Sequence, residues 1–120
     1  MNPTPNNDRG LSLTLRQHNG AIVGSLSGEA GLDQEGLLRR HMKALAAGTE
    51  PLVVLELAGV TFLSSIGLRA LLELRHELKA FGRRLVLANI SPVVSSVLQQ
   101  TKLNSQFEIA PTVDQGLHHS

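Results

Sequence analysis

The chain contains no cysteine, tryptophan or tyrosine, and three phenylalanines are its only large aromatic side chains. Without cysteine it can form no disulfide, no thiolate metal site and no thiol nucleophile, and the composition fits a reducing compartment. Three phenylalanines also leave few side chains for stacking on bases or for anchoring at a membrane interface. Nucleic-acid binding is therefore not expected.

The sequence also lacks an excess of either charge and a long apolar run. Eleven Lys and Arg residues against ten Asp and Glu give the 120 residues a formal charge of +1, which provides no field to draw nucleic acid or anionic lipid. The longest uncharged stretch, 85–101, is broken by Asn89, Pro92, three serines and two glutamines. A membrane-spanning helix needs about 20 mostly apolar residues. We expect a soluble, cytoplasmic protein with no membrane insertion.

The length and the two ends of the chain indicate one domain with short tails. A chain of this size buries roughly two thirds of its unfolded surface, which is enough for one core. Met1–Gly10 is rich in Asn and Pro and has no apolar core, so it is not a signal peptide. We predict a disordered N-terminal tail over 1–10, one domain over 11–117 and a C-terminal tail over 118–120.

The first part of the domain predicts a β-hairpin followed by a helix. Leucine alternates with polar residues over 11–16, and a second apolar run over 21–26 follows the turn sequence His18-Asn19-Gly20. This pattern is typical of two antiparallel strands with one solvated face. Apolar residues at helical spacing over 33–47, followed by Gly48, predict an amphipathic helix.

The rest of the chain alternates strands with helices. Nearly continuous apolar runs are typical of strands covered on both faces, and apolar residues three and four apart are typical of helices. The predicted elements are strands over 51–57, 85–88 and 107–109, and helices over 65–81, 91–101 and 112–117. Because right-handed crossovers place such strands parallel, we predict an α/β fold. Its mixed sheet has an antiparallel N-terminal hairpin, parallel later strands and about four helices.

Known chemical motifs are missing from the place where open α/β sheets bind ligands, the carboxyl ends of their strands. Segment 58–68 contains neither a P-loop nor a GxGxxG pattern, which excludes nucleotide binding by those routes. Ser65 has Gly67 after it but Leu63 before it, so only half of a nucleophile elbow is present, and no histidine is placed beside it. The five histidines share no zinc-binding spacing. We predict no catalytic residue, no metal site and no cofactor.

Two adjacent hydroxyls, Ser64 and Ser65, stand where the longest helix begins. A serine at a helix start usually caps the first turn, contributing about 1 kcal/mol, and capping needs only one of them. The free N–H groups and the positive end of the helix dipole also tolerate a phosphate on the neighbouring hydroxyl. Ser65 is therefore a candidate switch.

The residues around this serine pair resemble a known family signature. Leu-Glu-Leu-Ala-Gly-Val over 55–60 and Phe-Leu-Ser-Ser-Ile-Gly-Leu over 62–68 are similar to the central signature of STAS domains, the family of bacterial anti-sigma factor antagonists. In that family, Leu-Asp-Leu-Ser-Gly-Val leads to Phe-Ile-Asp-Ser-Ser-Gly-Leu. Segments 85–92, 97–98, 101–103 and 107–109 reinforce the resemblance, which covers 11–117.

The resemblance implies a regulatory role. In the family, an anti-sigma factor that is also a serine kinase phosphorylates the serine after the signature Asp, and a serine phosphatase restores it. On this chain that serine is Ser65. The unmodified antagonist binds the anti-sigma factor and frees the sigma factor, whereas the phosphorylated form does not. Such a domain is a kinase substrate and not an enzyme.

Two carboxylates of the family pattern are replaced here. Ser64 stands in place of the Asp before the phosphorylated serine, and Gly31 stands in place of an Asp expected in the loop after the hairpin. The remaining candidates for a carboxylate near the phosphosite are Glu29, Asp33 and Glu56. Glu56 takes the family's Asp position near the strand end, and a functional carboxylate and a charge at the sheet's edge are both open interpretations.

Four further residues complete the predicted neighbourhood of the switch, or partner interface: Ser64, Ile66, Gly67 and Arg69. Ile66 replaces a small residue of the family, and its side chain either packs inward or faces a partner. Arg69 follows Ser65 by one helical turn, where it can pair with a phosphate or with an acidic group of a partner. The other charges along this helix, with Arg83 and Arg84 just past it, are expected to be solvated.

Two functional interpretations follow. In the first, the chain is an anti-sigma factor antagonist regulated by phosphorylation of Ser65, with a kinase-type anti-sigma factor and a serine phosphatase as partners. In the second, which the missing carboxylates favour, it is a STAS subunit of a transport-associated or stress-sensing assembly that is not phosphorylated. The oligomeric state is open.

Overall fold

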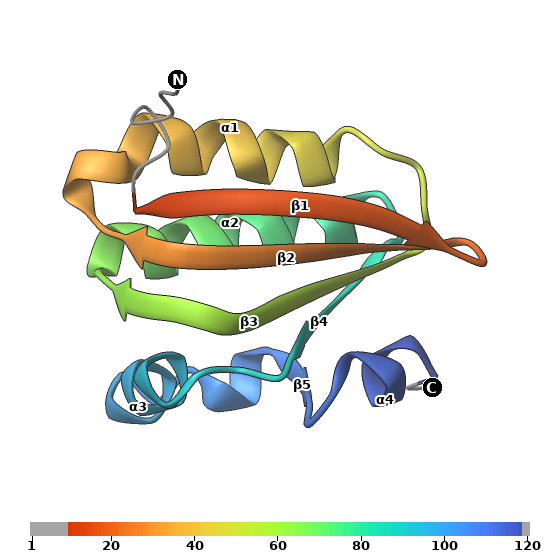
Figure 1. The fold of residues 1–120 in the computed structure, drawn as a ribbon. Coiled ribbons are helices and arrows are strands. Elements are labelled where there is room, and N and C mark those ends of the chain that lie inside the picture. Colours follow the sequence, from red (N-terminus) through yellow and green to blue (C-terminus); the bar gives the residue numbers. More distant parts are fainter. Residues whose placement is uncertain (1–9, 119–120) are drawn as a thin grey trace, which may run out of the picture.

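The computed structural model describes residues 10–118 (Figure 1). The predicted tails, 1–10 and 118–120, therefore fall largely outside the described residues. Five strands form one sheet in the order β1-β2-β3-β4-β5. They are β1 (Leu11–His18), β2 (Ala21–Ala30), β3 (Leu52–Leu63), β4 (Arg84–Ala88) and β5 (Glu108–Ala110). β1 and β2 are antiparallel and the other pairs are parallel, which confirms the predicted mixed sheet.

The described residues form four α-helices, as the sequence predicts. They are α1 (Glu35–Ala46), α2 (Ser65–Ala80), α3 (Pro92–Gln100) and α4 (Val113–Leu117), with short 3-10 turns at Leu32–Gln34 and Asn104–Gln106. The predicted helix over 33–47 was wrong at its start. Residues 33 and 34 belong to the 3-10 turn, and α1 begins only at Glu35. The hydroxyls of Ser91 and Thr112 cap α3 and α4 by accepting hydrogen bonds from main-chain N–H groups.

The hairpin turn is a local feature that the sequence specifies closely. Asn19 and Gly20 have φ of 49° and 85°, and they join the paired residues His18 and Ala21. Two residues at positive φ make the kind of turn whose twist matches that of the flanking strands, and Asn-Gly is its preferred sequence.

β2 and β3 are longer than the sequence predicts. β2 continues to Ala30 and β3 continues to Leu63, where the two strands are still paired. Their register shifts twice on the way, and a Cβ atom at Gly59 would lie 2.5 Å from the Cβ of Ser27 beside the first shift. Such irregularities break the alternation of apolar and polar residues. The prediction that β3 ends at residue 57 was wrong for this reason.

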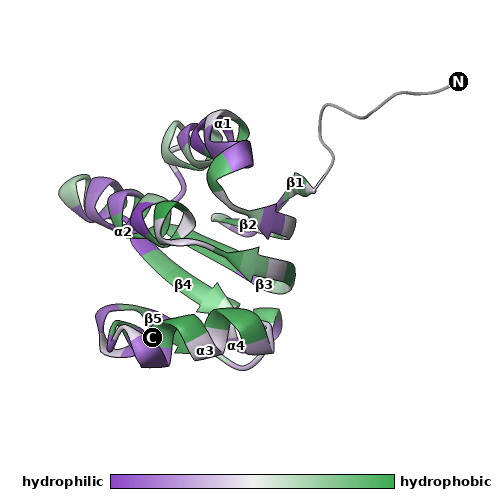
Figure 2. Ribbon diagram, turned by 90° about the vertical axis from the view of Figure 1, so that its left-hand side faces the viewer, coloured by the Kyte–Doolittle hydropathy of each residue, from purple (hydrophilic) through white to green (hydrophobic). Residues whose placement is uncertain are grey.

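Buried apolar side chains form a large core and a small one. α1 and α2 lie side by side on one side of the sheet (Figure 2), where α1 lies against β1 and β2 and α2 lies against β3 and β4. The small core contains Val23, Val54, Val86, Ala88 and Ala110, which α4 covers with Val113 and Leu117. The carboxyl ends of β2 and β3 and the first turns of α1 and α2 lie at the same end of the molecule (Figure 1).

No helix within 10–118 combines the length and the apolar character that crossing a membrane requires.

Candidate functional site

Ser64 forms the N-cap of α2 and uses its hydroxyl fully. The Oγ atom accepts hydrogen bonds from the main-chain N–H groups of Ile66 at 3.2 Å and Gly67 at 3.3 Å, and it donates to the carbonyl oxygen of Ala30 at 3.1 Å. The main-chain N–H of Ser64 donates to the same carbonyl at 3.0 Å. These bonds satisfy two helix N–H groups that have no partner inside the helix, and they fix α2 to the end of β2.

Ser65, the first residue of α2, is exposed to solvent. Within residues 10–118 its hydroxyl makes no hydrogen bond to another side chain or to the main chain, because Ser64 provides the cap. The structure thus places a free hydroxyl at the positive end of a helix of 16 residues. A group attached to this oxygen would displace no contact of the folded chain.

Gly67 is required by a close approach between α2 and the end of β2. A Cβ atom there would lie 2.7 Å from the carbonyl oxygen of Ala30 and 2.7 Å from Cδ1 of Leu63. Real side chains do not come so near a main-chain oxygen, so any larger residue would push the helix start away from the strand. Gly67 therefore sets the position of the serine pair.

Ile66 and Arg69 line a groove of about 390 Å³ between α1 and α2. Leu38, Met42 and Leu74 contribute its apolar floor. Ile66 is half-buried there, so its side chain neither joins the core fully nor projects freely. Arg69 is exposed, and within the described residues its guanidinium makes no ion pair, which leaves it available to an anion near the helix start.

Two of the three predicted carboxylates lie at the same end of the sheet as Ser65. Glu29 is exposed near the end of β2, where it is the register partner of Phe62 in β3. Asp33 is exposed in the 3-10 turn that follows β2. Both carboxylates therefore lie at the end of the sheet where α2 begins.

Glu56 lies apart from this neighbourhood. Seven residues of β3 follow it before Ser64, a span of about 26 Å at the usual rise of a strand. Its carboxylate accepts hydrogen bonds from Ser25 Oγ at 2.7 Å and Asn89 Nδ2 at 3.0 Å. These two bonds, in that order, hold the pKa of Glu56 below its ordinary value of 4.5, and Arg16 adds a smaller effect. β3 is the central strand, so the alternative of a charge at the sheet's edge was wrong.

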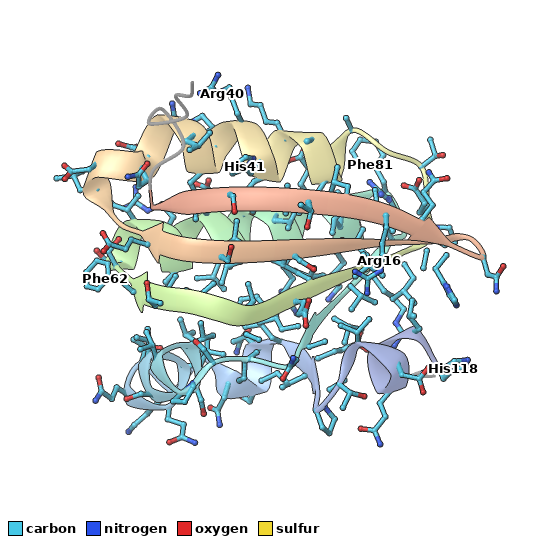
Figure 3. All side chains as sticks on the ribbon, viewed as in Figure 1. Arg16, Arg40, His41, Phe62, Phe81 and His118 are labelled. Carbon is cyan, nitrogen blue, oxygen red and sulfur yellow. The ribbon has the colours of Figure 1, made fainter. Side chains whose placement is uncertain are left out.

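An apolar patch beside the serine pair has no counterpart in the sequence prediction. Leu32 and Phe62 are large hydrophobic residues with exposed fractions of 67% and 50%. They flank Gly31, which is buried because the Phe62 ring lies over it. Figure 3 shows Phe62 at the end of β3, at the end of the molecule where α2 begins. Phe62 belongs to the family signature quoted above. Apolar residues in such a run are usually expected to be buried, so the sequence did not indicate that Phe62 is exposed.

Within the described part of the chain, no group of three or more His, Asp or Glu side chains is placed to hold a metal ion. The site is therefore a surface of one exposed hydroxyl, one cation, two carboxylates and an apolar patch. Such a surface is suited to contact with another protein.

A family model for the STAS domain matches residues 12–116. The chain belongs to the STAS domain family. The five-stranded mixed sheet with four helices over the described residues is the fold expected for this STAS domain.

Two relatives of this STAS domain carry names that refer to anti-sigma factor antagonists. BtrV of Bordetella bronchiseptica, a candidate anti-sigma factor antagonist, is 28% identical over 100 residues, which cover 83% of this chain and 86% of BtrV. The crystal structure of an anti-sigma factor antagonist from Mycobacterium paratuberculosis is similar with a TM-score of 0.77 and 29% identity, over 90% of this chain and 92% of that one.

The fold of this STAS domain is also that of SpoIIAA. The unphosphorylated form of that anti-sigma factor antagonist matches with a TM-score of 0.71 and 23% identity, over 88% of this chain and 93% of that chain. The Bacillus SpoIIAA has also been solved in its phosphorylated form, which matches with a TM-score of 0.67 and 21% identity, over 89% of this chain and 97% of that chain.

Proposed function

We propose that this STAS domain is an anti-sigma factor antagonist that acts by partner switching. Its unmodified form binds an anti-sigma factor of the serine-kinase type through the surface around Ser65. Phosphorylation of Ser65 releases the partner, and a serine phosphatase restores the binding form. The protein is then a kinase substrate in the cytoplasm and has no catalytic residue of its own.

The observation that carries this proposal is the division of roles between the two serines. The Ser64 hydroxyl makes three hydrogen bonds, two that cap α2 and one to Ala30, whereas the hydroxyl of Ser65 is exposed and makes none within 10–118. A kinase can therefore reach Ser65 without unfolding the first turn of the helix. The helix N-terminus also tolerates the added anion.

The apolar patch explains why a phosphate would weaken binding. Phosphorylation adds about −1.5 to −2 charges at pH 7, and a partner that covers the patch would have to remove water from that charge. A penalty of about 1 to 3 kcal/mol already changes affinity by roughly 5- to 150-fold. No change of fold is needed.

Arg69 gives the phosphate a local partner. It follows Ser65 by four residues in α2, and side chains at that spacing are neighbours on a helix surface. In the phosphorylated form we propose that its guanidinium pairs with the phosphate. In the unmodified form it is available to an acidic group of the anti-sigma factor.

The proposal is tested by phosphorylating the protein with the kinase-type anti-sigma factor of the same organism and ATP. Mass spectrometry should place one phosphate on Ser65, and Ser65→Ala should abolish it. Ser64→Ala is the matched control, because it removes the adjacent hydroxyl and should still be phosphorylated. Phosphate found only at another residue would contradict the proposal.

The second candidate, a constitutive assembly subunit, is favoured by one observation. Gly31 replaces a carboxylate of the family pattern, and the Phe62 ring occupies the space in which that carboxylate would start. For such a subunit, Ser65→Ala and Ser65→Glu should bind the partner equally well. Weaker binding by Ser65→Glu than by Ser65→Ala would exclude the constitutive subunit.

A further inference from the structure

Four large hydrophobic side chains are exposed among residues 10–118, and two of them occur together. Leu15 lies on β1 and Phe81 lies at the end of α2, whereas Leu32 and Phe62 flank Gly31. Single exposed hydrophobic residues are common on protein surfaces and need no explanation. A pair beside a candidate switch is a more specific observation, because apolar patches on soluble proteins mark contacts with other molecules.

The Phe62 ring lies over the main chain of Gly31, where the lack of a side chain leaves room for it. The backbone of Gly31 has a φ of −120°, which any residue adopts, so its conformation does not require glycine. A Cβ atom there would instead lie 3.0 and 3.3 Å from two ring atoms of Phe62. The ring thus rests on the main chain with its other face exposed. An aromatic group supported in this way loses little further freedom when a partner covers it.

We propose that Phe62 and Leu32 are the anchor residues of the contact with the anti-sigma factor, and that this partner offers them an apolar recess. The inference rests on the proposed function and adds the chemistry of the partner's surface. Aromatic side chains surrounded by a polar rim are typical of the residues that dominate binding free energies.

The charges around Leu32 and Phe62 indicate which side chains should surround the partner's apolar recess. Glu29 is the register partner of Phe62, and Asp33 directly follows Leu32. Both carboxylates are exposed and neither makes an ion pair within the described residues. The recess should therefore be bordered by Lys or Arg side chains, which would speed association more than they tighten the complex.

Phe81 offers a matched control within the same chain. It has an exposed fraction of 76%, more than Phe62, yet it lies at the opposite end of the molecule (Figure 3). Its charged neighbours in the sequence are Lys79 and Arg83. Truncating Phe62 or Phe81 removes the same side chain from the surface. Only the first truncation should alter the proposed contact.

The test measures binding of purified variants to the kinase-type anti-sigma factor of the same organism by titration calorimetry. Phe62→Ala should weaken binding roughly tenfold or more, and Phe81→Ala should stay within about twofold of wild type. Leu32→Asp serves as a second variant, because residue 32 is too exposed for the change to unfold the domain, and it should also weaken binding. Replacing both Glu29 and Asp33 by their amides should slow association and reduce its dependence on salt.

The outcomes separate this inference from the proposed function. If Phe62→Ala and Leu32→Asp bind like wild type while Ser65→Glu does not bind, the anchor assignment is wrong and the proposed function stands. If Phe81→Ala weakens binding as much as Phe62→Ala does, the anchor assignment is also wrong. If unmodified wild type does not bind the anti-sigma factor, both are wrong.

Discussion

Arg83 donates a hydrogen bond from Nε to the carbonyl oxygen of Glu50 at 2.6 Å, although the two residues are 33 positions apart. Its two Nη atoms donate to the carbonyl oxygens of Ala46 at 3.0 Å and Leu45 at 3.4 Å. The side chain is buried, and the Glu50 carboxylate lies 3.6 Å from Nη2. A guanidinium thus satisfies carbonyls at the end of α1 that have no partner inside the helix.

Arg83→Ala should lower the free energy of unfolding by about 2–4 kcal/mol, because several buried carbonyls lose a charged donor at once. Urea denaturation followed by circular dichroism measures the change. Arg84→Ala is the neighbouring control. Its ion pair with Glu108 is partly exposed, so we expect a loss of less than about 1 kcal/mol. Equal losses for the two variants would contradict the capping role of Arg83.

The two serines at the start of α2 should differ in their effect on stability. Ser64→Ala removes the N-cap and should cost about 1 kcal/mol, within a range of roughly 0.5 to 2. Ser65→Ala removes a hydroxyl without contacts and should change the free energy of unfolding by less than about 0.5 kcal/mol. Thermal melting of both variants measures this difference. A larger loss for Ser65→Ala would show that its hydroxyl has a structural role.

Gly67→Ala should be destabilising even though alanine favours helices. The added Cβ would overlap the main-chain oxygen of Ala30, so the start of α2 has to move, at a cost of about 1–3 kcal/mol. Gly36→Ala in α1 is the control, because nothing lies within 4 Å of a Cβ there and the change should stabilise by up to about 1 kcal/mol. Denaturant titrations compare the two.

Glu56 should make stability depend on pH. Its pKa is lower in the folded chain than its ordinary value of 4.5, because Ser25 and then Asn89 donate hydrogen bonds to the carboxylate. The contribution of Glu56 to the free energy of unfolding is therefore fully present above pH 4.5. It is lost as the pH falls through the pKa that Glu56 has in the folded chain. In Glu56→Gln this contribution is absent, so the difference in unfolding free energy from wild type should shrink between about pH 6 and pH 3. A difference that stays constant over this range would contradict the assignment.

Features that depend only on residues close together in the sequence could be predicted. The Asn19-Gly20 turn and the Ser91 cap depend on a few consecutive positions, and the apolar spacing of α2 extends over several turns. The position of the serine pair was predictable for the same reason, since Ser64 and Ser65 are adjacent at a helix start. Family resemblance added the expected role of Ser65.

Features that depend on contacts between distant segments could not be predicted. Arg83 stands beside Arg84 in a charged stretch, and only the packed fold shows that one is buried on helix carbonyls while the other pairs at the surface. The length of β3 was missed because two register shifts hide the alternation. The exposure of Phe62 depends on the shape of β2 around Gly31, which no local pattern describes.

Because the cap of α2 belongs to Ser64, residue 65 makes no contribution that folding depends on. A lineage of such proteins can therefore exchange this residue in a single mutational step, losing or regaining a modifiable hydroxyl while the scaffold persists. Descendants of one ancestor with and without this hydroxyl would then differ at this position without differing in architecture.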